Sequence, residues 1–408
     1  MVRTRRSSRR IPGTPVSPWL VAVLVLLSML SSTLLIPAVR PFFAAVHPGQ
    51  EGALHAFMSI NMLGAILGAP ALGWLADKSG QRTWTLGIAA LVDGVLLFAC
   101  SLPLPLPLVL SLRFLQGAAN VGVLSLLMGL AGTRGVPLAG GATIFAIALG
   151  APLGGLLLKI SPAAPLQVGA MLPLCVAAAV AALQPLWPAR SAAGFFDVLK
   201  SQQLAWSPAL LIFVERFAIG GFVVPFSLMA YDVWGFDRAS VSGLYSAFLM
   251  PFAVATALLP RVFARGASWA RLVTAGIAAY ALCLFFVPRL PDRLPLALLL
   301  VVGGLGAAAV YAPSLRVAAA NVDGRLRSVT MGLMNAAGSL GMLLGTAIAG
   351  FLSTTLQARG FEKGAALTVV FSFSSLSLVV VWALAIRAFA RAADGSGEPG
   401  RAPASSAP

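Results

Sequence analysis

Long apolar stretches, each about the length needed to cross a lipid bilayer, follow one another along almost the whole chain. A helix needs about 20 apolar residues to cross the hydrocarbon, and short connections that often contain Pro or Gly separate the stretches. The candidate spans are residues 19–39, 53–76, 83–102, 106–130, 142–160, 165–187, 208–230, 239–260, 269–288, 294–315, 326–356 and 364–388. The pattern predicts an all-α integral membrane protein with twelve transmembrane helices, and the short connections make neighbouring helices antiparallel.

The longest internal connection separates six spans from six and divides the chain into two halves. The predicted organisation is a basic cytoplasmic segment at 1–18, an N-terminal six-helix bundle at 19–187, a cytoplasmic linker at 188–207, a C-terminal six-helix bundle at 208–388 and a disordered cytoplasmic tail at 389–408. Aromatic and charged residues interleave in the linker, which suits either a short interfacial helix or a disordered connection.

The amino-acid composition agrees with the prediction of a chain embedded in a lipid bilayer. Apolar residues make up 59% of the 408 residues and charged residues 10%, whereas soluble domains are about half apolar and a quarter charged. The formal net charge of +16 could indicate a nucleic-acid partner, but the basic residues lie in short interhelical segments rather than on one face or in one domain. We therefore expect no nucleic-acid partner.

The distribution of Lys and Arg predicts the orientation in the membrane. With a cytoplasmic N-terminus, 19 of the 28 basic residues fall on the cytoplasmic side, 7 fall outside and 2 lie within spans, as the positive-inside rule requires. The apolar stretch at 19–39 is too long for the apolar region of an export signal, which is about 7–15 residues. We expect a retained first span, both termini in the cytoplasm, and a bacterial cytoplasmic (inner) membrane.

Metal, cofactor and enzyme chemistry find little support in the sequence. Cys100, Cys175 and Cys283 each lie alone in an apolar run, without the spacing of a disulfide framework or zinc site. There is no phosphate-binding loop for ATP. An intramembrane transferase would need His, Asp or Glu grouped at the membrane boundary, and His47 and His55 do not supply that group. We expect no metal, no cofactor and no enzymatic activity.

The connection between the second and third spans reads Gly73-Trp74-Leu75-Ala76-Asp77-Lys78-Ser79-Gly80-Gln81-Arg82. Asp77 would lie at the carboxyl end of a helix, where the helix dipole disfavours an anion, so we expect it to seek the amino end of another helix. The cytoplasmic start of the eleventh span, near Arg325 and Arg327, is the candidate partner.

This connection resembles the cytoplasmic signature of the major facilitator superfamily, although Gln81 stands where a basic residue is usual. The resemblance implies two six-helix bundles that rock about a midplane site and a gate that stabilises the outward-facing state. Its glycines would allow close backbone approach, and its basic residues could pair with acidic groups. The implied gating residues are Gly73, Asp77, Lys78, Gly80 and Arg82. A tight turn that only fixes topology is the alternative.

The fourth span carries Arg113-Phe114-Leu115-Gln116-Gly117, which is similar to a further motif of the same superfamily. Arg113, Gln116 and Asn120 share one helix face, which must point into the protein or a wet cavity. The resemblance implies that this arginine influences proton transfer. A static ion pair with Asp93 of the third span is the alternative.

The fifth span contains Gly150-Ala151-Pro152-Leu153-Gly154-Gly155, which resembles a signature of proton-coupled drug exporters but is one residue shorter. The eleventh span occupies the corresponding place in a weak internal repeat. Small residues four apart and a proline bend suit a seam between the bundles, and packing inside one bundle explains them equally. The candidates for interbundle packing are Gly150, Pro152, Gly154, Gly155, Gly338, Gly341 and Gly345.

Carboxylates within membrane spans are candidates for function. Glu215, on the seventh span, lies on a helix that the resemblance places along the cavity, and apolar surroundings would let it exchange a proton. Arg216 follows directly, yet consecutive helix residues point about 100° apart, so the two need not pair. Holding the helix against its neighbours is the alternative role. The candidate substrate-cavity residues are Asn120, Phe222, Tyr245, Tyr311 and Asn335.

Together these features predict a secondary transporter that works by alternating access, and the resemblance points to proton-coupled export of a small amphipathic or lipophilic compound. The expected partners are that small molecule, protons as the coupling ion and the lipid bilayer, with the chain a monomer. An importer or facilitator of a nutrient, and a lipid or lysolipid flippase of the same fold, are the alternatives.

Overall fold

The computed structural model describes residues 16–50, 53–182, 195, 206–262 and 268–395. The regular elements in this part of the chain are helical. The α-helices are α1 (Pro18–Thr33), α2 (Val39–Val46), α3 (Ala53–Ser79), α4 (Arg82–Cys100), α5 (Leu106–Leu157), α6 (Ala164–Ala182), α8 (Trp206–Leu228), α9 (Arg238–Val262), α10 (Trp269–Phe286), α11 (Arg293–Ala320), α12 (Arg327–Ala358) and α13 (Lys363–Gly395). Three short turns are η1 (Met229–Val233), η2 (Val287–Arg289) and η3 (Gly324–Leu326).

Each predicted span corresponds to a helix. Within the described residues, 10 helices are long and apolar enough to cross a membrane. One of them, α5, has 52 residues and supplies two predicted spans, while α1 is a shorter apolar helix. The prediction of an all-α integral membrane protein is confirmed. The predicted linker, except Phe195, Trp206 and Ser207, and the first fifteen residues of the basic segment lie outside the described residues.

The connection between the fourth and fifth spans is much shorter than predicted. The apolar pattern leaves residues 131–141 as a loop, but α5 departs from helical geometry inside only at Gly132, with φ +66° and ψ 172°. Glycine adopts this positive φ without the clash of a Cβ atom. A single residue therefore separates the two helical segments of α5.

The ends of two other spans also differ from the prediction. The first span, predicted to run to Val39, ends as α1 at Thr33 and continues after a turn as α2, because Pro37 lacks the amide needed to continue the helix. The last helix continues to Gly395, so residues 389–395 are helical and not part of a disordered tail. Phe389 and Ala393 are buried, and this packing stabilises the extension.

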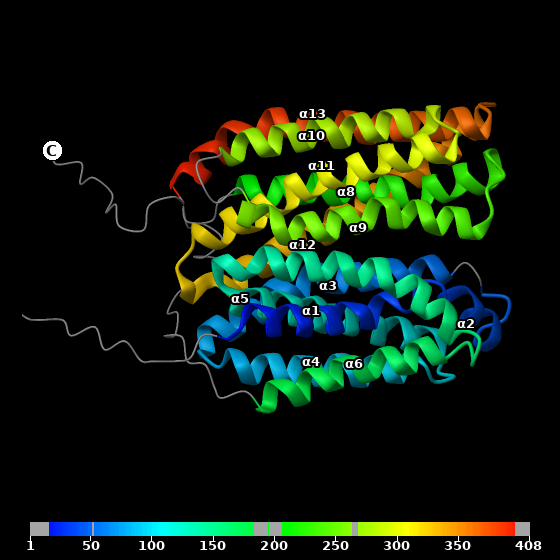
Figure 1. Cartoon of the computed structure of the whole chain (residues 1–408). Helices are drawn as coiled ribbons and strands as arrows, with labels where there is room; N and C mark the ends of the chain where they lie inside the picture. The colour runs from blue at the N-terminus through cyan, green and yellow to red at the C-terminus, as the bar shows by residue number, and fades with distance from the viewer. Residues whose placement is uncertain (1–15, 51–52, 183–194, 196–205, 263–267, 396–408) are drawn as a thin grey trace, which may run out of the picture.

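The helices form two groups that lie side by side (Figure 1). Helices α1 to α6 make the lower group and α8 to α13 the upper one, and α1 begins at the same end of the molecule where α13 ends. Large apolar side chains on the outside are exposed, among them Ile160, Leu294, Phe351 and Leu384. In a membrane these side chains contact lipid rather than water.

The glycines predicted to join the two bundles instead pack helices inside each bundle. A Cβ atom at Gly154 would overlap the carbonyl oxygen of Leu34, and one at Gly150 would overlap Thr33, so this part of α5 lies against the end of α1. In the second half, Gly341 and Gly345 approach the backbone of α8 in the same way. The internal repeat is therefore visible in how α1 packs on α5 and α8 on α12.

The remaining members of that predicted set show no approach to the opposite half among the described residues. A Cβ atom at Gly338 would meet the side chains of Ile212 and Arg216, both on α8. Gly155 has open space around it, and Pro152 is exposed. The interbundle prediction was wrong for the five glycines that approach helices of their own half, because glycine spacing shows that a helix face is close to another backbone but not which helix supplies it. For Gly155 and Pro152 it stays a prediction.

Candidate functional site

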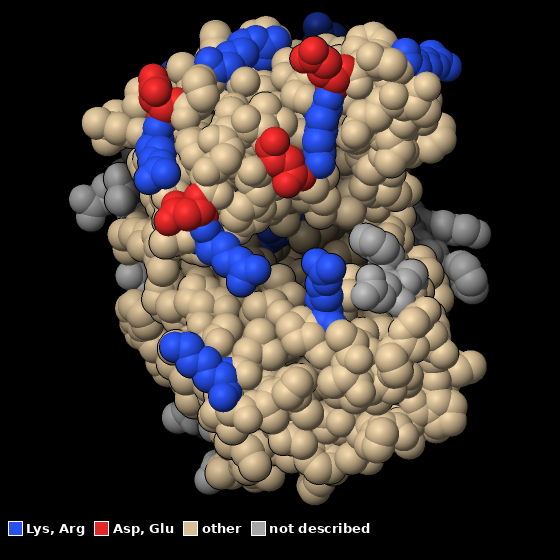
Figure 2. Space-filling model, turned by 90° about the vertical axis from the view of Figure 1, so that its right-hand side faces the viewer, with Lys and Arg blue, Asp and Glu red and all other residues tan. Residues whose placement is uncertain are grey.

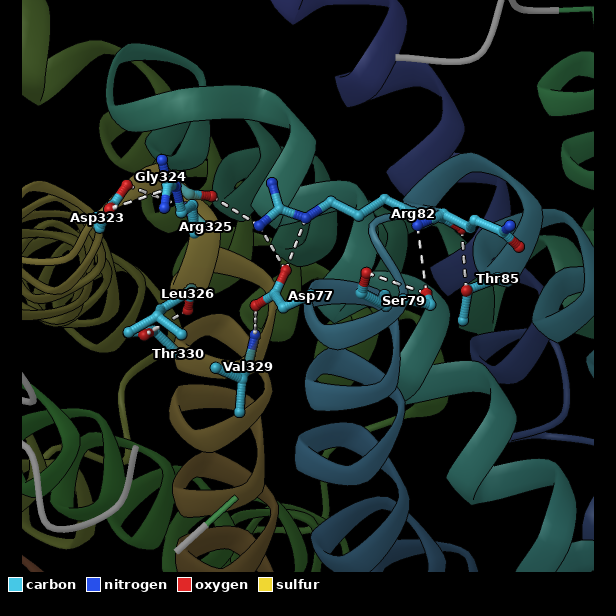
Figure 3. A network of polar contacts seen from close by, with 12 residues as sticks. Asp77, Ser79, Arg82, Thr85, Asp323, Gly324, Arg325, Leu326, Val329 and Thr330 are labelled. Carbon is cyan, nitrogen blue, oxygen red and sulfur yellow. Dashed lines mark hydrogen bonds and ion pairs between the residues drawn. The ribbon is translucent and has the colours of Figure 1, made fainter. Parts of the chain in front are cut away.

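Asp77, near the carboxyl end of α3, caps the beginning of α12 in the other half (Figure 3). Its Oδ2 atom accepts a hydrogen bond of 2.9 Å from the backbone amide of Val329, and its Oδ1 atom accepts one of 2.6 Å from Nε of Arg82. An anion at a helix amino end satisfies free amides and interacts favourably with the dipole. The predicted partner of Asp77 is confirmed.

Arg82 extends this contact to a third segment of the chain. Its Nη2 atom donates a hydrogen bond of 2.6 Å to the carbonyl oxygen of Gly324, in the turn between α11 and α12. Both Arg82 and Asp77 are buried. An ion pair that is hydrogen-bonded and buried on both sides is costly to break, because each partner would be left with an unpaired buried charge.

The other predicted gating residues have different surroundings. Nζ of Lys78 lies 4.6 Å from the centre of the Trp74 ring, and Lys78 has no ion pair with an acidic group of the described residues. Gly80 has φ +69°, which lets the chain turn from α3 into α4, and a Cβ atom at Gly73 would lie 2.6 Å from the carbonyl oxygen of Ser328. Gln81, the departure from the superfamily signature, is exposed and is not part of the Asp77 contact.

In the first half, Gln116 joins the two charged residues of the neighbouring spans. Its Nε2 atom donates to Oδ1 of Asp93 at 2.6 Å, and its Oε1 atom accepts a hydrogen bond from Nη1 of Arg113 at 2.5 Å. All three side chains are buried. An amide bridge therefore takes the place of the direct ion pair, and both charged groups polarise the amide of Gln116 in the same direction.

Asn120 connects Asp93 to α1. Its Nδ2 atom donates to Oδ2 of Asp93 at 2.8 Å, and its Oδ1 atom accepts a hydrogen bond of 3.0 Å from the hydroxyl of Ser32. On the other side of the network, Nδ2 of Asn61 donates to Gln116 at 2.9 Å. The network therefore connects α1, α3, α4 and α5, and Asn61 and Ser32 at its edges are only partly buried. Asn61 was not singled out in the sequence, since apolar residues surround it in its span.

In the second half, Glu215 and Arg216 form an ion pair despite being consecutive on α8. Nε of Arg216 lies 3.4 Å from Oε2 of Glu215. The side chain of Glu215 is 0% exposed and that of Arg216 is 12% exposed. The long, flexible arginine bends back to reach its neighbour, which the angle between consecutive helix positions does not exclude.

Glu215 and Arg216 differ in the partners of their polar atoms. Neither carboxylate oxygen of Glu215 has a hydrogen-bond partner in the described structure, and the hydroxyl of Tyr280 on α10 is likewise without one. The guanidinium carbon of Arg216 lies 4.4 Å from the centre of the Tyr311 ring and 5.8 Å from that of Phe252. Glu215 is therefore enclosed within the second bundle, whereas Arg216 points toward rings of α9 and α11.

Contacts between the halves lie toward the end where α1 begins and α13 ends. On α3 and α12, Cβ atoms at Gly73 and Gly332 would meet the opposite backbone, and on α5 a Cβ atom at Gly141 would lie 2.8 Å from the carbonyl oxygen of Ala253. Nδ2 of Asn335 donates to the hydroxyl of Ser125 at 3.0 Å, which adds a hydrogen bond between α12 and α5.

The opposite end of the molecule is open. Figure 2 shows a hollow between the upper and lower parts of this face, with Lys or Arg atoms visible deep inside it. Charged residues of both signs surround the hollow, and acidic residues appear on the upper part. The two halves are therefore joined at one end and separated at the other.

Solved structures share the fold of this chain over nearly its whole length. The human organic anion transporter MFSD10 (TETRAN) is similar with a TM-score of 0.67, at 16% sequence identity, over 90% of this chain and 98% of its own. The major facilitator superfamily proton:xylose symporter XylE, bound to 6-bromo-6-deoxy-D-glucose, has a TM-score of 0.69 at 12% identity over 90% and 95% of the two chains. This chain has the major facilitator fold. No protein-family model and no curated protein matches its sequence.

Within the major facilitator fold of this chain, the candidate cavity residues have separate positions. Phe222 is buried among Phe226, Phe248 and Phe371 inside the second bundle, and the hydroxyl of Tyr245 contacts Ser227 of the neighbouring helix at 2.8 Å. These two residues have contacts within that bundle, and their place in a substrate cavity stays a prediction. Their aromatic character suits a bundle core as well as a cavity wall.

Of the other three cavity candidates, Tyr311 and Asn335 lie at the boundary between the halves. Tyr311 is beside Arg216 and also close to Gly140 of α5. Asn335 makes the hydrogen bond to the first half, and Asn120 belongs to the Asp93 network. The close approach of Gly140 and Gly141 to α9 and α11 was missed, although two adjacent glycines just before the predicted fifth span were a visible signal.

Proposed function

We propose that this chain is a secondary active transporter that moves a small amphipathic or lipophilic compound across a membrane by alternating access, coupled to proton movement. Export in exchange for protons is the leading direction, as the resemblance of the fifth span suggests. The proposed setting is a bacterial cytoplasmic membrane, with a monomeric chain and both termini in the cytoplasm.

The observation that carries the proposal is the one-sided closure of the molecule. The Asp77 contact with Val329 joins the halves at one end, while the opposite end is hollow (Figure 2). Two rigid bundles joined by few polar contacts can exchange this arrangement for its opposite by rocking. Such an exchange exposes a central site to each side of the membrane in turn.

Coupling to protons is supported by the state of Glu215. An ionised carboxylate without hydrogen-bond donors is costly in an apolar interior, and among the described residues Arg216, at 3.4 Å, is the cation that compensates for it. If Arg216 moved away from Glu215, the carboxylate would be left as an unpaired buried charge, and protonation of Glu215 would neutralise it. The Glu215 and Arg216 pair is therefore the proposed coupling group.

A groove at the seam between the halves supports an amphipathic or lipophilic substrate. This cavity, with a volume of about 250 Å³, lies between α1, α5 and α9, and the residues that line it include Trp19, Leu26, Leu138, Phe145 and Val254. Trp19 and Val254 are exposed on the outer surface, so the groove faces lipid. A compound dissolved in the bilayer could reach the seam without first entering water.

Transport by purified protein in lipid vesicles tests the proposal. With a pH gradient imposed, we expect accumulation of lipophilic fluorescent dyes from a panel of anionic, neutral and cationic members, and we expect Glu215→Gln to abolish the dependence on the gradient. Glu362→Gln, which changes an exposed carboxylate, is the matched control. Proton-driven transport that is unaltered in Glu215→Gln would remove this residue from the coupling mechanism.

Cotransport of the compound with protons is the second candidate. It is favoured by the pairing of Glu215 with a cation, since a ligand that engages Arg216 would release the carboxylate to take up a proton. XylE, one of the similar structures, is described as a proton:xylose symporter. The direction of the pH gradient that drives accumulation in the same vesicles distinguishes the two candidates.

A further inference from the structure

Arg216 differs from the other charged residues inside the described spans. Asp93 accepts two amide hydrogen bonds, and Arg113 is buried with Gln116 as its acceptor. Arg216 is the more exposed partner of its ion pair, with 12% of its side chain accessible. It lies on α8, halfway along the span and beside the junction of α9, α11 and α12.

The hydrogen-bonding capacity of Arg216 is not exhausted by its neighbours. A guanidinium has five N–H donors and matches a carboxylate or a similar planar anion with two parallel hydrogen bonds. Neither oxygen of Glu215 accepts a hydrogen bond in the described structure, and the hydroxyl of Tyr311 pairs with the guanidinium. Donors of the guanidinium are therefore left for a ligand.

The surroundings of the guanidinium suit an anion with an apolar body. Rings of Tyr311 and Phe252 lie 4.4 and 5.8 Å from its central carbon, and Ile212 packs beside Gly338 on the facing side. A dry, partly aromatic site strengthens the attraction between opposite charges and favours burial of an apolar group. A free cation in such a site would be repelled by Arg216, and a neutral compound would leave its donors unpaired.

We propose that Arg216 binds the anionic group of the transported compound, so that the substrate class is a small amphipathic organic anion, such as an aromatic carboxylate. Glu215 is the internal counter-ion that this anion displaces from the guanidinium. The inference rests on the proposed transport function and names its substrate class.

Displacement of Glu215 from Arg216 by the bound anion would couple binding of the anion to protonation of Glu215. The titratable groups that face Glu215 are Arg216 on its own helix, Tyr280 on α10 and Tyr311 on α11, so Arg216 is the cation that compensates the carboxylate. When an anion takes this cation, a proton on Glu215 restores a net charge of zero at the site. Anion and proton therefore bind together, which favours cotransport, the second of the two candidates, for anionic compounds.

Binding of three probes with the same ring and different charge tests the inference. Naphthalene-2-carboxylate, naphthalene-2-methanol and naphthalene-2-methylammonium are compared by equilibrium binding to the full chain in lipid nanodiscs. We expect the carboxylate to bind at least about tenfold more tightly than the alcohol, and the ammonium to bind most weakly. Equal affinity for the carboxylate and the alcohol would overturn the anion site.

Variants of the pair sharpen this test. We expect Arg216→Gln to weaken carboxylate binding by about 10- to 100-fold with little effect on the alcohol, and Glu215→Gln to strengthen it by freeing the guanidinium. The double variant Glu215→Gln/Arg216→Gln keeps the charge balanced and should fold where Arg216→Gln alone does not. Arg359→Gln, which changes an exposed arginine at the end of α12, is the control.

Carboxylate preference that persists in the double variant would overturn the role of Arg216. The dye transport described above tests the proposed function separately. Transport of neutral dyes by a protein that shows no carboxylate preference would leave the transporter standing and reject the anionic substrate class.

Discussion

The carboxylate of Asp77 and the amide of Val329 are 252 positions apart in the chain and are joined by a hydrogen bond of 2.9 Å. Each belongs to a different half, so this bond forms only when the halves meet at that end of the molecule. Arg82 holds the same carboxylate and contacts Gly324 of the second half. The strength of this small contact therefore affects the balance between the two arrangements of the halves.

Replacing Asp77 by Asn should weaken closure without removing the cap. The amide oxygen still accepts from Val329, but the charge that attracts Arg82 is lost. We expect a cysteine at Ser125, which is buried at the boundary between the halves, to react about tenfold faster with a thiol reagent, as a loss of about 1.4 kcal/mol implies. Asp323→Asn, which changes an exposed carboxylate in the nearby turn, should leave the rate unchanged. An equal rate in Asp77→Asn would contradict the gating role.

Replacing Gln116 by Leu should destabilise the first half. The substitution removes the bridge between Arg113 and Asp93 and costs roughly 1–3 kcal/mol for each buried group left unpartnered. Thermal unfolding in detergent measures the effect as a lower midpoint temperature. Gln357→Leu is the control, because this exposed glutamine contacts only Ser353 of its own helix. Equal midpoints for the two variants would show that the bridge does not stabilise the fold.

Replacing Gly341 by Ala should separate α12 from α8. The new Cβ atom would overlap the carbonyl oxygen of Phe213, and overpacking of this kind costs about 1–3 kcal/mol. Gly350, on the same helix, has open space around it, so Gly350→Ala should be nearly neutral. Thermal midpoints of the two alanine variants provide the comparison, and a Gly341→Ala midpoint as high as that of Gly350→Ala would reject the close approach.

Apolar length and turn chemistry were enough to place the spans, because hydrocarbon imposes the same minimum on every helix. The partner of Asp77 could also be predicted, since the dipole at a helix carboxyl end disfavours an anion and few other helix starts lie on the same side. Gly132 was harder to predict. Nothing in an apolar run distinguishes a glycine that reverses the chain from one that packs.

The candidate site was only partly predictable for a related reason. Sequence indicates that Asp93, Arg113, Glu215 and Arg216 must avoid lipid, but their partners come from helices whose facing sides are set by packing. Gln116 therefore stands between the charges of the first half, and Arg216 bends toward Glu215 in the second. The aromatic residues around Phe222 carry no sequence mark that separates a bundle core from a cavity wall.

The central claim is that closing one end of the molecule opens the other. Spin labels at Gln81 and Arg325 report on the joined end, and labels at Lys159 and Asp237, beyond the far ends of α5 and α9, report on the hollow end. All four positions are exposed. The variant Gly73→Leu has a side chain that must hold α3 away from Ser328. The first distance, between the labels at Gln81 and Arg325, and the second, between those at Lys159 and Asp237, are measured in this variant and in the parent protein. The account predicts that the first distance lengthens while the second shortens; a second distance that stays constant or also lengthens would contradict it.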